Sequence, residues 1–391
     1  MFCDANKMNR YEEHLAPFAC RSALSRGRRH PEPEQEGRNI FQRDRDRIIH
    51  STAFRRLEYK TQVFVNHEGD HYRTRLTHSI EVAQIARSIC RALDLQEDLA
   101  ESVALAHDLG HTPFGHSGQD ALNEVMAPYG GFEHNRQSLR IVTELERRYA
   151  AFPGLNLSYE TLEGMIKHSS HYDRAPDGAA RDFHPEEQPT LEAQIGNLAD
   201  EIAYNNHDVD DGLRAGILTI EGLRRTTLFR RSHDAALAVC VGGCSERVVV
   251  HETVRRMINH LITDVIRQTR ANLKQAGVTS LEDVRRAPEP LVAFSPEVTA
   301  WGRELKEYLH HNMYHHYRVA RMSHKATRVI QELFHAYFEH PMMLPPGPAA
   351  RIPPDADDRL RARVIADYIA GMTDRYALDE HDRLFATHCP T

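Results

Sequence analysis

Apolar residues recur every three or four positions through most of the chain, as in helices that bury one face. In residues 78–95 the recurring apolar positions are Val82, Ile85, Ala86, Ile89 and Leu93. The same spacing returns in 99–106 and 189–208, and no Gly or Pro interrupts 250–273. No convincing alternation of apolar and polar residues marks a β-strand. The pattern therefore predicts an all-α protein.

Breaks in the pattern divide the chain. Residues 1–47 are poor in apolar positions and, from Arg21 on, rich in Arg and Pro, which predicts an irregular basic N-terminal arm. We expect the main helical domain in 48–340. Prolines crowd the first part of 341–391 and predict a linker before a C-terminal helical segment. Residues 173–189 are predicted to form a loop, and the chain shows no internal repeat.

Composition excludes several classes of protein. With 41% apolar and 27% charged residues, the 391-residue chain is ordinary for a globular protein. Its longest nearly uncharged apolar stretch, 235–244, is too short for the ~20 residues of a membrane span. The N-terminus has no apolar segment with a small-residue cleavage site, so no secretory signal is expected. The net charge of −7 provides no global attraction for nucleic acid.

The cysteines are too sparse for a disulfide framework, and we expect free thiols in a cytoplasmic protein. The six cysteines are Cys3, Cys20, Cys90, Cys240, Cys244 and Cys389. Cys240 and Cys244 have no nearby second pair, so a zinc knuckle is not expected.

Histidine is the unusual residue, with 26 in the chain. A lone His-Asp pair is usually solvated or hydrogen-bonded, but the histidines between 67 and 134 have apolar, small neighbours. Buried imidazoles need partners, and a metal ion supplies one. Consecutive helical residues point about 100° apart, so His107 and Asp108 can share an ion only from a helix end or corner. Leu109 and Gly110 supply that corner, with Gly110 as the expected helix terminator.

Longer motifs carry a family resemblance. The segments RTRLTHS (73–79), HDLGHTPFGH (107–116) and NLADEIAY (197–204) resemble the HD-domain phosphohydrolases, and more narrowly the deoxyguanosine triphosphate triphosphohydrolase-like family of bacterial enzymes. The similarity also includes 25–34, 42–64, 132–142 and 367–377, and so extends over nearly the whole chain. It implies an HD-domain helical bundle.

The resemblance also implies a set of site residues. The implied metal ligands are His78, His107, Asp108 and Asp200. The implied catalytic histidine is His116, with His111 and His134 on the phosphate side. The implied substrate-binding residues are Arg75 for phosphate, and Gln62, Tyr204 and Asp208 for the deoxyribose. An N/O ligand set suits a divalent ion other than calcium, with Mn or Mg preferred and Fe, Ni, Co or Zn compatible.

Spacing gives one of these roles a physical basis. Asp200, Tyr204 and Asp208 lie four residues apart and so on one helix face. An aromatic ring beside the sugar leaves little space for a 2′-hydroxyl, which favours deoxynucleotides.

One position departs from the family pattern. Many members have an acidic residue three positions after the catalytic histidine, where this chain has Gln119. A glutamine cannot raise the basicity of His116 through charge, although it can orient the ring. We expect either slower activity or the substitution of another carboxylate, such as Glu133.

The reaction implied by the resemblance is metal-dependent hydrolysis of a deoxynucleoside triphosphate (dNTP), dGTP or a broader set, at the α-phosphorus. The products are the deoxynucleoside and triphosphate. Two alternatives stay open. The chain could be an HD phosphohydrolase that acts on another nucleotide or an oligonucleotide end, because the metal set fixes the chemistry and not the substrate. It could also be a dNTP- or single-stranded-DNA-binding regulator with a weakened centre, which Gln119 favours.

The basic residues of 21–60 alternate with acids and predict ion pairs within or between subunits. The alternative is phosphate recognition, at an allosteric dNTP site or along single-stranded DNA. The resemblance further implies a homo-oligomer.

Overall fold

A computed structural model describes the following residues: 12–33, 35–62, 73–168, 182–240 and 243–387. These residues form helices joined by loops, with three isolated β-bridges and no sheet among them. The all-α prediction is therefore confirmed. Cys3, Cys389 and most of the expected loop 173–189 lie outside the described residues. No helix in the described part is both long and apolar enough to cross a lipid bilayer.

The chain divides into two compact units, each built from three segments. Unit 1 comprises Met1–Ile48, His78–Leu105 and Asn156–His316. Unit 2 comprises Ile49–Thr77, Ala106–Leu155 and Tyr317–Thr391. The domain boundaries expected at residues 47/48 and 340/341 stay a prediction.

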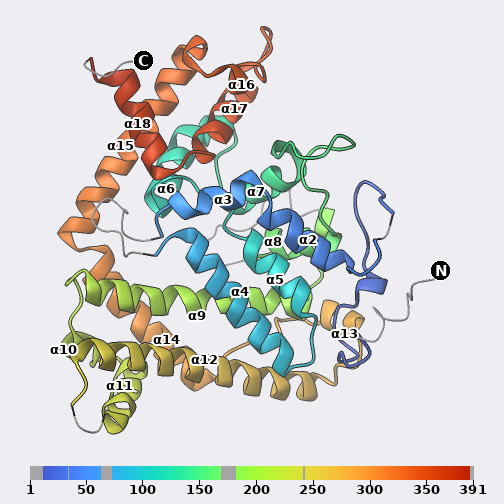
Figure 1. The fold of residues 1–391 in the computed structure, drawn as a ribbon, viewed down its shortest axis with the longest axis vertical. Helices are drawn as coiled ribbons and strands as arrows, with labels where there is room; N and C mark the ends of the chain where they lie inside the picture. Colours follow the sequence, from blue (N-terminus) through green and yellow to red (C-terminus); the bar gives the residue numbers. More distant parts are fainter. Residues whose placement is uncertain (1–11, 34, 63–72, 169–181, 241–242, 388–391) are drawn as a thin grey trace. The chain divides into compact units, whose positions relative to one another are not determined.

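Long helices dominate unit 1. Its helices are the 3-10 helix η1 (Ser22–Leu24), α2 (Ile40–Ile49), α4 (Arg75–Ala92, whose first three residues belong to unit 2), α5 (Glu97–Ala106), α8 (Tyr159–Ile166), α9 (Leu191–Arg214), α10 (Ile220–Leu223), α11 (Thr227–Val239), α12 (Glu246–Ala276), α13 (Leu281–Arg285), α14 (Pro296–Leu309) and the π-helix η7 (His310–Tyr314). Helix α12 packs against α11 and α9, and α14 packs against α9 and α11 (Figure 1). Helices α9, α11, α12 and α14 therefore pack together in this part of unit 1.

Helix α9 matters most for the site, and its sequence explains its bounds. The side chain of Thr190 caps the helix by accepting a hydrogen bond from the amide of Ala193. Ile195 and Ile202 are fully buried on its apolar face. After Arg214 the chain leaves the helix at Gly216, whose φ of 65° suits glycine.

Residues 40–47 of the expected arm are helical, and their charges pair inside unit 1. Phe41 in α2 packs with Leu99 and Val103. The buried carboxylate of Asp44 accepts hydrogen bonds from the amide and hydroxyl of Ser158 at 2.8 and 2.6 Å, and it pairs with Arg28. The Arg28–Asp44 pair is therefore one of the ion pairs within the subunit that the sequence predicts.

Unit 2 contains the shorter helices and the C-terminal segment. Its helices are α3 (Thr52–Arg56), η2 (Leu57–Tyr59), α6 (Gly115–Met126), η4 (Ala127–Tyr129), α7 (His134–Arg140), the π-helix η5 (Ile141–Leu145), α15 (Tyr317–Glu339), η8 (Pro341–Met343), α16 (Pro346–Ala349), α17 (Asp358–Ala370) and α18 (Asp374–Phe385). Helix α15 packs against α6, α17 and α18. Apolar residues of α6, α15 and α17 form the core of the unit, including Leu122, Leu333 and Ile365.

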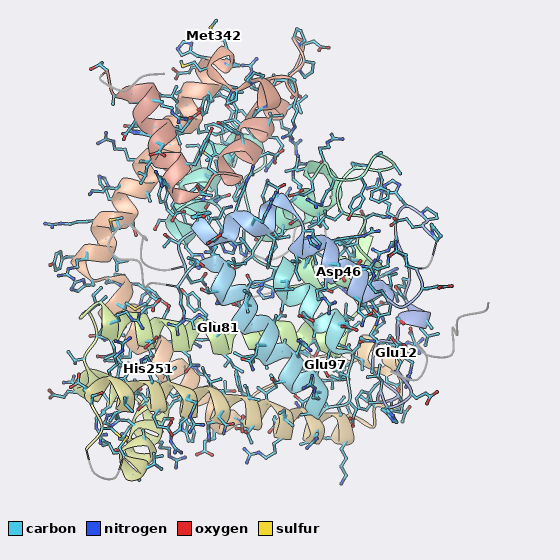
Figure 2. All side chains as sticks on the ribbon, viewed as in Figure 1. Glu12, Asp46, Glu81, Glu97, His251 and Met342 are labelled. Carbon is cyan, nitrogen blue, oxygen red and sulfur yellow. The ribbon has the colours of Figure 1, made fainter. Side chains whose placement is uncertain are left out.

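The last helical stretch expected from the sequence is two helices. Helix α17 ends at Ala370, and Thr373 caps α18 by accepting a hydrogen bond from the amide of Tyr376. The proline-rich segment before them leaves Met342 91% exposed at the edge of the unit (Figure 2). The break after α17 matters because it positions Asp374 at the start of α18.

The buried carboxylate of Asp44 gives a stability prediction. We expect Asp44→Ala to lower the free energy of unfolding by about 3–5 kcal/mol, because it leaves the Arg28 guanidinium and several donors buried without their acceptor. Asp46, labelled in Figure 2, lies on the same helix and pairs with Arg38, which is half exposed. Asp46→Ala is the control, with an expected loss below about 1 kcal/mol. Urea unfolding monitored by circular dichroism measures both, and equal losses would contradict the role of Asp44.

Candidate active site

The chain turns a corner directly after α5, and His107 and Asp108 lie on it. The hydroxyl of Ser138 in α7 accepts a hydrogen bond from the Gly110 amide at 2.8 Å and donates to the His107 carbonyl at 3.0 Å. A Cβ on Gly110 would lie 2.2 Å from two backbone atoms of α7. Helix α5 ends at Ala106, four residues before Gly110, and Gly110 does not have a positive φ, so the expectation that Gly110 terminates the helix is wrong. The glycine is needed because α7 approaches the corner so closely.

Three basic groups surround the Asp108 carboxylate in unit 2. Its Oδ1 lies 3.0 Å from Arg75 Nη1, 3.0 Å from His111 Nδ1 and 3.4 Å from His107 Nε2. Burial opposes ionisation, but the charges of His107 and Arg75 outweigh it and hold the pKa of Asp108 well below its usual range. Burial and Arg75 lower the pKa of His111 to about 3. At neutral pH, Asp108 is therefore ionised and His111 is neutral.

The other predicted catalytic histidines gather around His111. The His111 ring centroid lies 4.0 Å from that of His134 and 6.0 Å from that of His116. His134 Nδ1 lies 2.8 Å from Gln119 Oε1 and 3.1 Å from Glu133 Oε1. The glutamine at the unusual position therefore orients His134, and the carboxylate of Glu133 lies against the same nitrogen.

A residue that the sequence reasoning missed ties two segments of unit 2 together. Asp374 accepts hydrogen bonds from the amides of Thr61 and Phe114, each at 2.9 Å. Phe114 has a φ of 62°, which is rare for a residue with a side chain. These bonds hold the segment before Gln62 and the segment before His116. Gln62 is buried, and its Oε1 has no hydrogen-bond partner in the described part of the chain.

In unit 1, His78 of α4 and Asp200 of α9 meet, with His78 Nε2 2.8 Å from Asp200 Oδ1. His168 Nε2 lies 3.4 Å from the other carboxylate oxygen of Asp200. His78 Nδ1 lies 3.3 Å from Nδ1 of His207, which is ion-paired with Glu81, labelled in Figure 2. Sequence reasoning missed His168 and His207; the spacing of His207, seven residues after Asp200 on α9, was the available signal.

The predicted sugar-binding residues of α9 share a partner. Tyr314 of η7 donates a hydrogen bond to the buried carboxylate of Asp208, and its Oη lies 3.1 Å from that of Tyr204. Tyr204 and Asp208 are thus linked by a second aromatic ring. Tyr314 has no local signal in the sequence, because it comes from another part of the chain.

Within each unit, the predicted ligands fit a metal ion. With bonds of about 2.0–2.2 Å, two ligand atoms of one ion lie about 2.8–3.6 Å apart. The separations of 2.8 Å for His78–Asp200 and 3.4 Å for His107–Asp108 are in this range. Imidazole nitrogen with carboxylate oxygen suits a divalent transition metal. The donor atoms therefore fit a divalent cation.

Two domains of known families match parts of the chain. Residues 75–205 match the HD domain, and residues 292–383 match the phosphohydrolase-associated domain. Deoxyguanosinetriphosphate triphosphohydrolase-like proteins of Ralstonia nicotianae and Thiobacillus denitrificans are each 58% identical over 96% of this chain, and over 95% and 98% of their own lengths. That of Geobacter sulfurreducens is 56% identical over 95% of both chains.

The chain belongs to the deoxyguanosinetriphosphate triphosphohydrolase-like family. The resemblance read from the motifs is confirmed, and the protein is an HD-domain hydrolase. The HD match contains all four predicted metal ligands, and the phosphohydrolase-associated match contains Tyr314 and Asp374. Tyr314 and Asp374, to which the sequence assigned no role, therefore lie in the second matched domain.

Asp374 gives a prediction that needs no substrate. Burial raises the pKa of this carboxyl group, and its backbone hydrogen bonds oppose the rise. We expect Asp374→Ala to lower the free energy of unfolding by about 2–3 kcal/mol, because two buried amides lose their acceptor. Asp379→Ala is the control, since Asp379 lies on the same helix in an exposed pair with Arg375. Thermal and urea unfolding measure the difference, and a loss no larger than in the control would refute the anchoring role.

Proposed function

We propose that this protein hydrolyses deoxynucleoside triphosphates to the deoxynucleoside and triphosphate with the help of a divalent metal ion. The observation that carries the proposal is the buried contact between Arg75 and Asp108. In this contact Arg75, the proposed phosphate-binding residue, lies directly beside Asp108, a proposed metal ligand. The names of the relatives, which point to deoxyguanosine triphosphate, support the substrate class.

In this proposal His78, His107, Asp108 and Asp200 hold one ion, with Mn or Mg preferred. The ligand-like spacing within each pair supports this set. A second support comes from α4, where Arg75, the partner of Asp108, lies one helical turn before His78. When bound, the ion supplies positive charge to the phosphoryl group and favours ionisation of water near neutral pH.

The chain's own groups do the rest of the chemistry. Arg75 neutralises charge that develops on the phosphoryl oxygens, and its Nε has no hydrogen-bond partner among the described residues. His116, which is partly exposed, transfers a proton to or from the attacking water or the leaving oxygen. His111 is neutral at pH 7, so it orients other groups through hydrogen bonds rather than through charge.

The sugar is read by Gln62, Tyr204 and Asp208, to which we add Tyr314. The Tyr314–Asp208 hydrogen bond fixes the carboxylate that faces the 3′-hydroxyl in this proposal. Two tyrosine rings beside the sugar supply the bulk that excludes a 2′-hydroxyl. A homo-oligomeric state, a dNTP effector, binding of single-stranded DNA and a cytoplasmic location remain predictions.

The reaction is tested by product analysis. Purified protein with Mn²⁺ or Mg²⁺ is incubated with each dNTP, each NTP and pairs of dNTPs, because an enzyme that needs an activator is inactive with one nucleotide. We expect deoxynucleoside and intact triphosphate in equal amounts, with ribonucleotides cleaved at least tenfold more slowly. Release of orthophosphate or pyrophosphate would reject cleavage at the α-phosphorus. Binding of nucleotides without turnover in any metal would favour the regulator.

The ligand set is tested with His107→Ala. We expect this variant to lose the bound metal and, with it, to have a turnover rate at least 10³-fold lower. Loss of one ligand weakens binding of the ion, and without the ion the phosphoryl group is misplaced. His251→Ala on α12 is the control, since His251 is exposed and belongs to neither ligand pair. Elemental analysis and circular dichroism accompany the assay. Full metal content in His107→Ala would remove His107 from the set.

Glu133 provides a prediction for the unusual glutamine. With Gln119 neutral, Glu133 is the carboxylate next to His134, and we expect Glu133→Gln to lower kcat about tenfold. The amide oxygen of the variant can still cap α7, as the carboxylate does. Glu144→Gln is the matched control, because Glu144 is an exposed residue of the next helix, paired with Arg140. Unchanged kcat in both variants would show that Glu133 does not replace the missing acid.

A further inference from the structure

Unit 2 contains a cavity of about 390 Å³ that the proposed reaction does not use. Side chains of α3, η5 and α17 and the segment around α16 line it, and none of the predicted site residues is among them. Four cationic side chains contribute to the wall: Arg56, Lys60, Arg147 and Arg351. A concavity lined by several positive charges attracts anions, because its electrostatic potential is positive.

Lys60 is the unusual member of this wall. It is 2% exposed, and its ammonium donates hydrogen bonds to two neutral groups, the carbonyls of His111 and Ala370 at 2.5 and 2.8 Å. No carboxylate is among its hydrogen-bond partners in the described residues. Burial, with repulsion from Arg75 and Arg56, lowers the pKa of Lys60 to about 7. A buried cation without a hydrogen-bonded counter-ion is costly, and its third donor is available to a ligand.

The acids of the wall are already engaged. Asp367 accepts hydrogen bonds from Arg140, Gln137 and Arg351, the last at 2.7 Å. Glu146 accepts one from the amide of Ala53 at 2.8 Å. Two carboxylates therefore face four lining cations, and the wall keeps an excess of positive charge. Arg147 lines the cavity and is exposed, and no ion pair of its side chain is seen in the described part of the chain.

We propose that this cavity is a binding site for a phosphate-bearing anion. Guanidinium groups present forked donors that match phosphate oxygens, and three of the four cations here are arginines. The volume is within the range of small-molecule sites. Most of the other lining residues are apolar or aromatic, among them Leu109, Leu145 and Tyr368, which can cover a flat ring. Inorganic triphosphate and a nucleoside triphosphate share the required chemistry.

The site has a structural link to the corner at Asp108. Lys60 holds the carbonyl of His111, and Leu109 of the cavity wall follows Asp108 in the chain. An anion in the cavity would favour the charged form of Lys60. The hydrogen bond from its ammonium to the His111 carbonyl would then be stronger. The binding proposal itself does not rest on the proposed hydrolysis.

The test uses calorimetric titration of full-length protein with inorganic triphosphate in the presence of EDTA, which prevents turnover. The test variant is Arg56→Gln with Arg147→Gln. The matched control is Arg55→Gln with Arg148→Gln, which removes the same charge from neighbouring exposed positions outside the cavity wall. We expect saturable binding to the unmodified protein, at least tenfold weaker binding to the test variant, and a change below twofold in the control.

Absence of saturable binding, or equal weakening in both double variants, would overturn the proposal. Circular dichroism verifies that each variant folds, and Arg147→Gln against Arg148→Gln replaces the doubles if either does not. A second titration with a nucleoside triphosphate identifies the source. Tenfold tighter binding than triphosphate would mean that the apolar wall takes the base, and equal affinity would mean that the phosphates alone are bound; both support the site.

Discussion

The close approach of α7 to Gly110 is the constraint on which the corner with His107 and Asp108 depends. Any side chain at Gly110 would collide with the backbone of α7, and the hydroxyl of Ser138 bonds both to that glycine and to the His107 carbonyl. Because interiors are close-packed, an extra methyl group here would have to move a helix. The direction in which His107 and Asp108 point is therefore fixed by the packing of α7 as much as by their own conformation.

Buried carboxylates also connect distant segments of the chain. Each of them accepts hydrogen bonds from groups that are far away in the sequence. Asp44 collects donors from residues more than 100 positions away in unit 1, and Asp374 does so over longer separations in unit 2. Asp367 gathers two arginines and a glutamine. A carboxylate can be buried at this cost only when several donors compensate it. In this protein the segments of each discontinuous unit are joined in this way.

Membership in the family fixes the kind of chemistry more firmly than the substrate. HD-type ligands direct the reaction to phosphorus, while the choice of nucleotide depends on the groups around the sugar and base. Gln119 and Glu133 illustrate the tolerance of such a site, because an amide and a carboxylate share one nitrogen of His134. In this chain the carboxylate beside His134 comes from Glu133, and position 119 supplies an amide.

The sequence by itself determined the helical class, the family with its implied ligands, and the positions of α9 and α12, whose ends extend up to six residues beyond the segments 189–208 and 250–273. Periodicity and caps are local signals, and long motifs preserve residue identity, so both can be read along the chain. Only the tertiary structure showed the contacts of Tyr314, Asp374, His168 and Lys60. It also showed that Gly110 is required for the close packing of α7 and does not terminate a helix. These residues act through partners far away in the chain, and no periodicity or spacing reports which distant groups a fold will bring into contact.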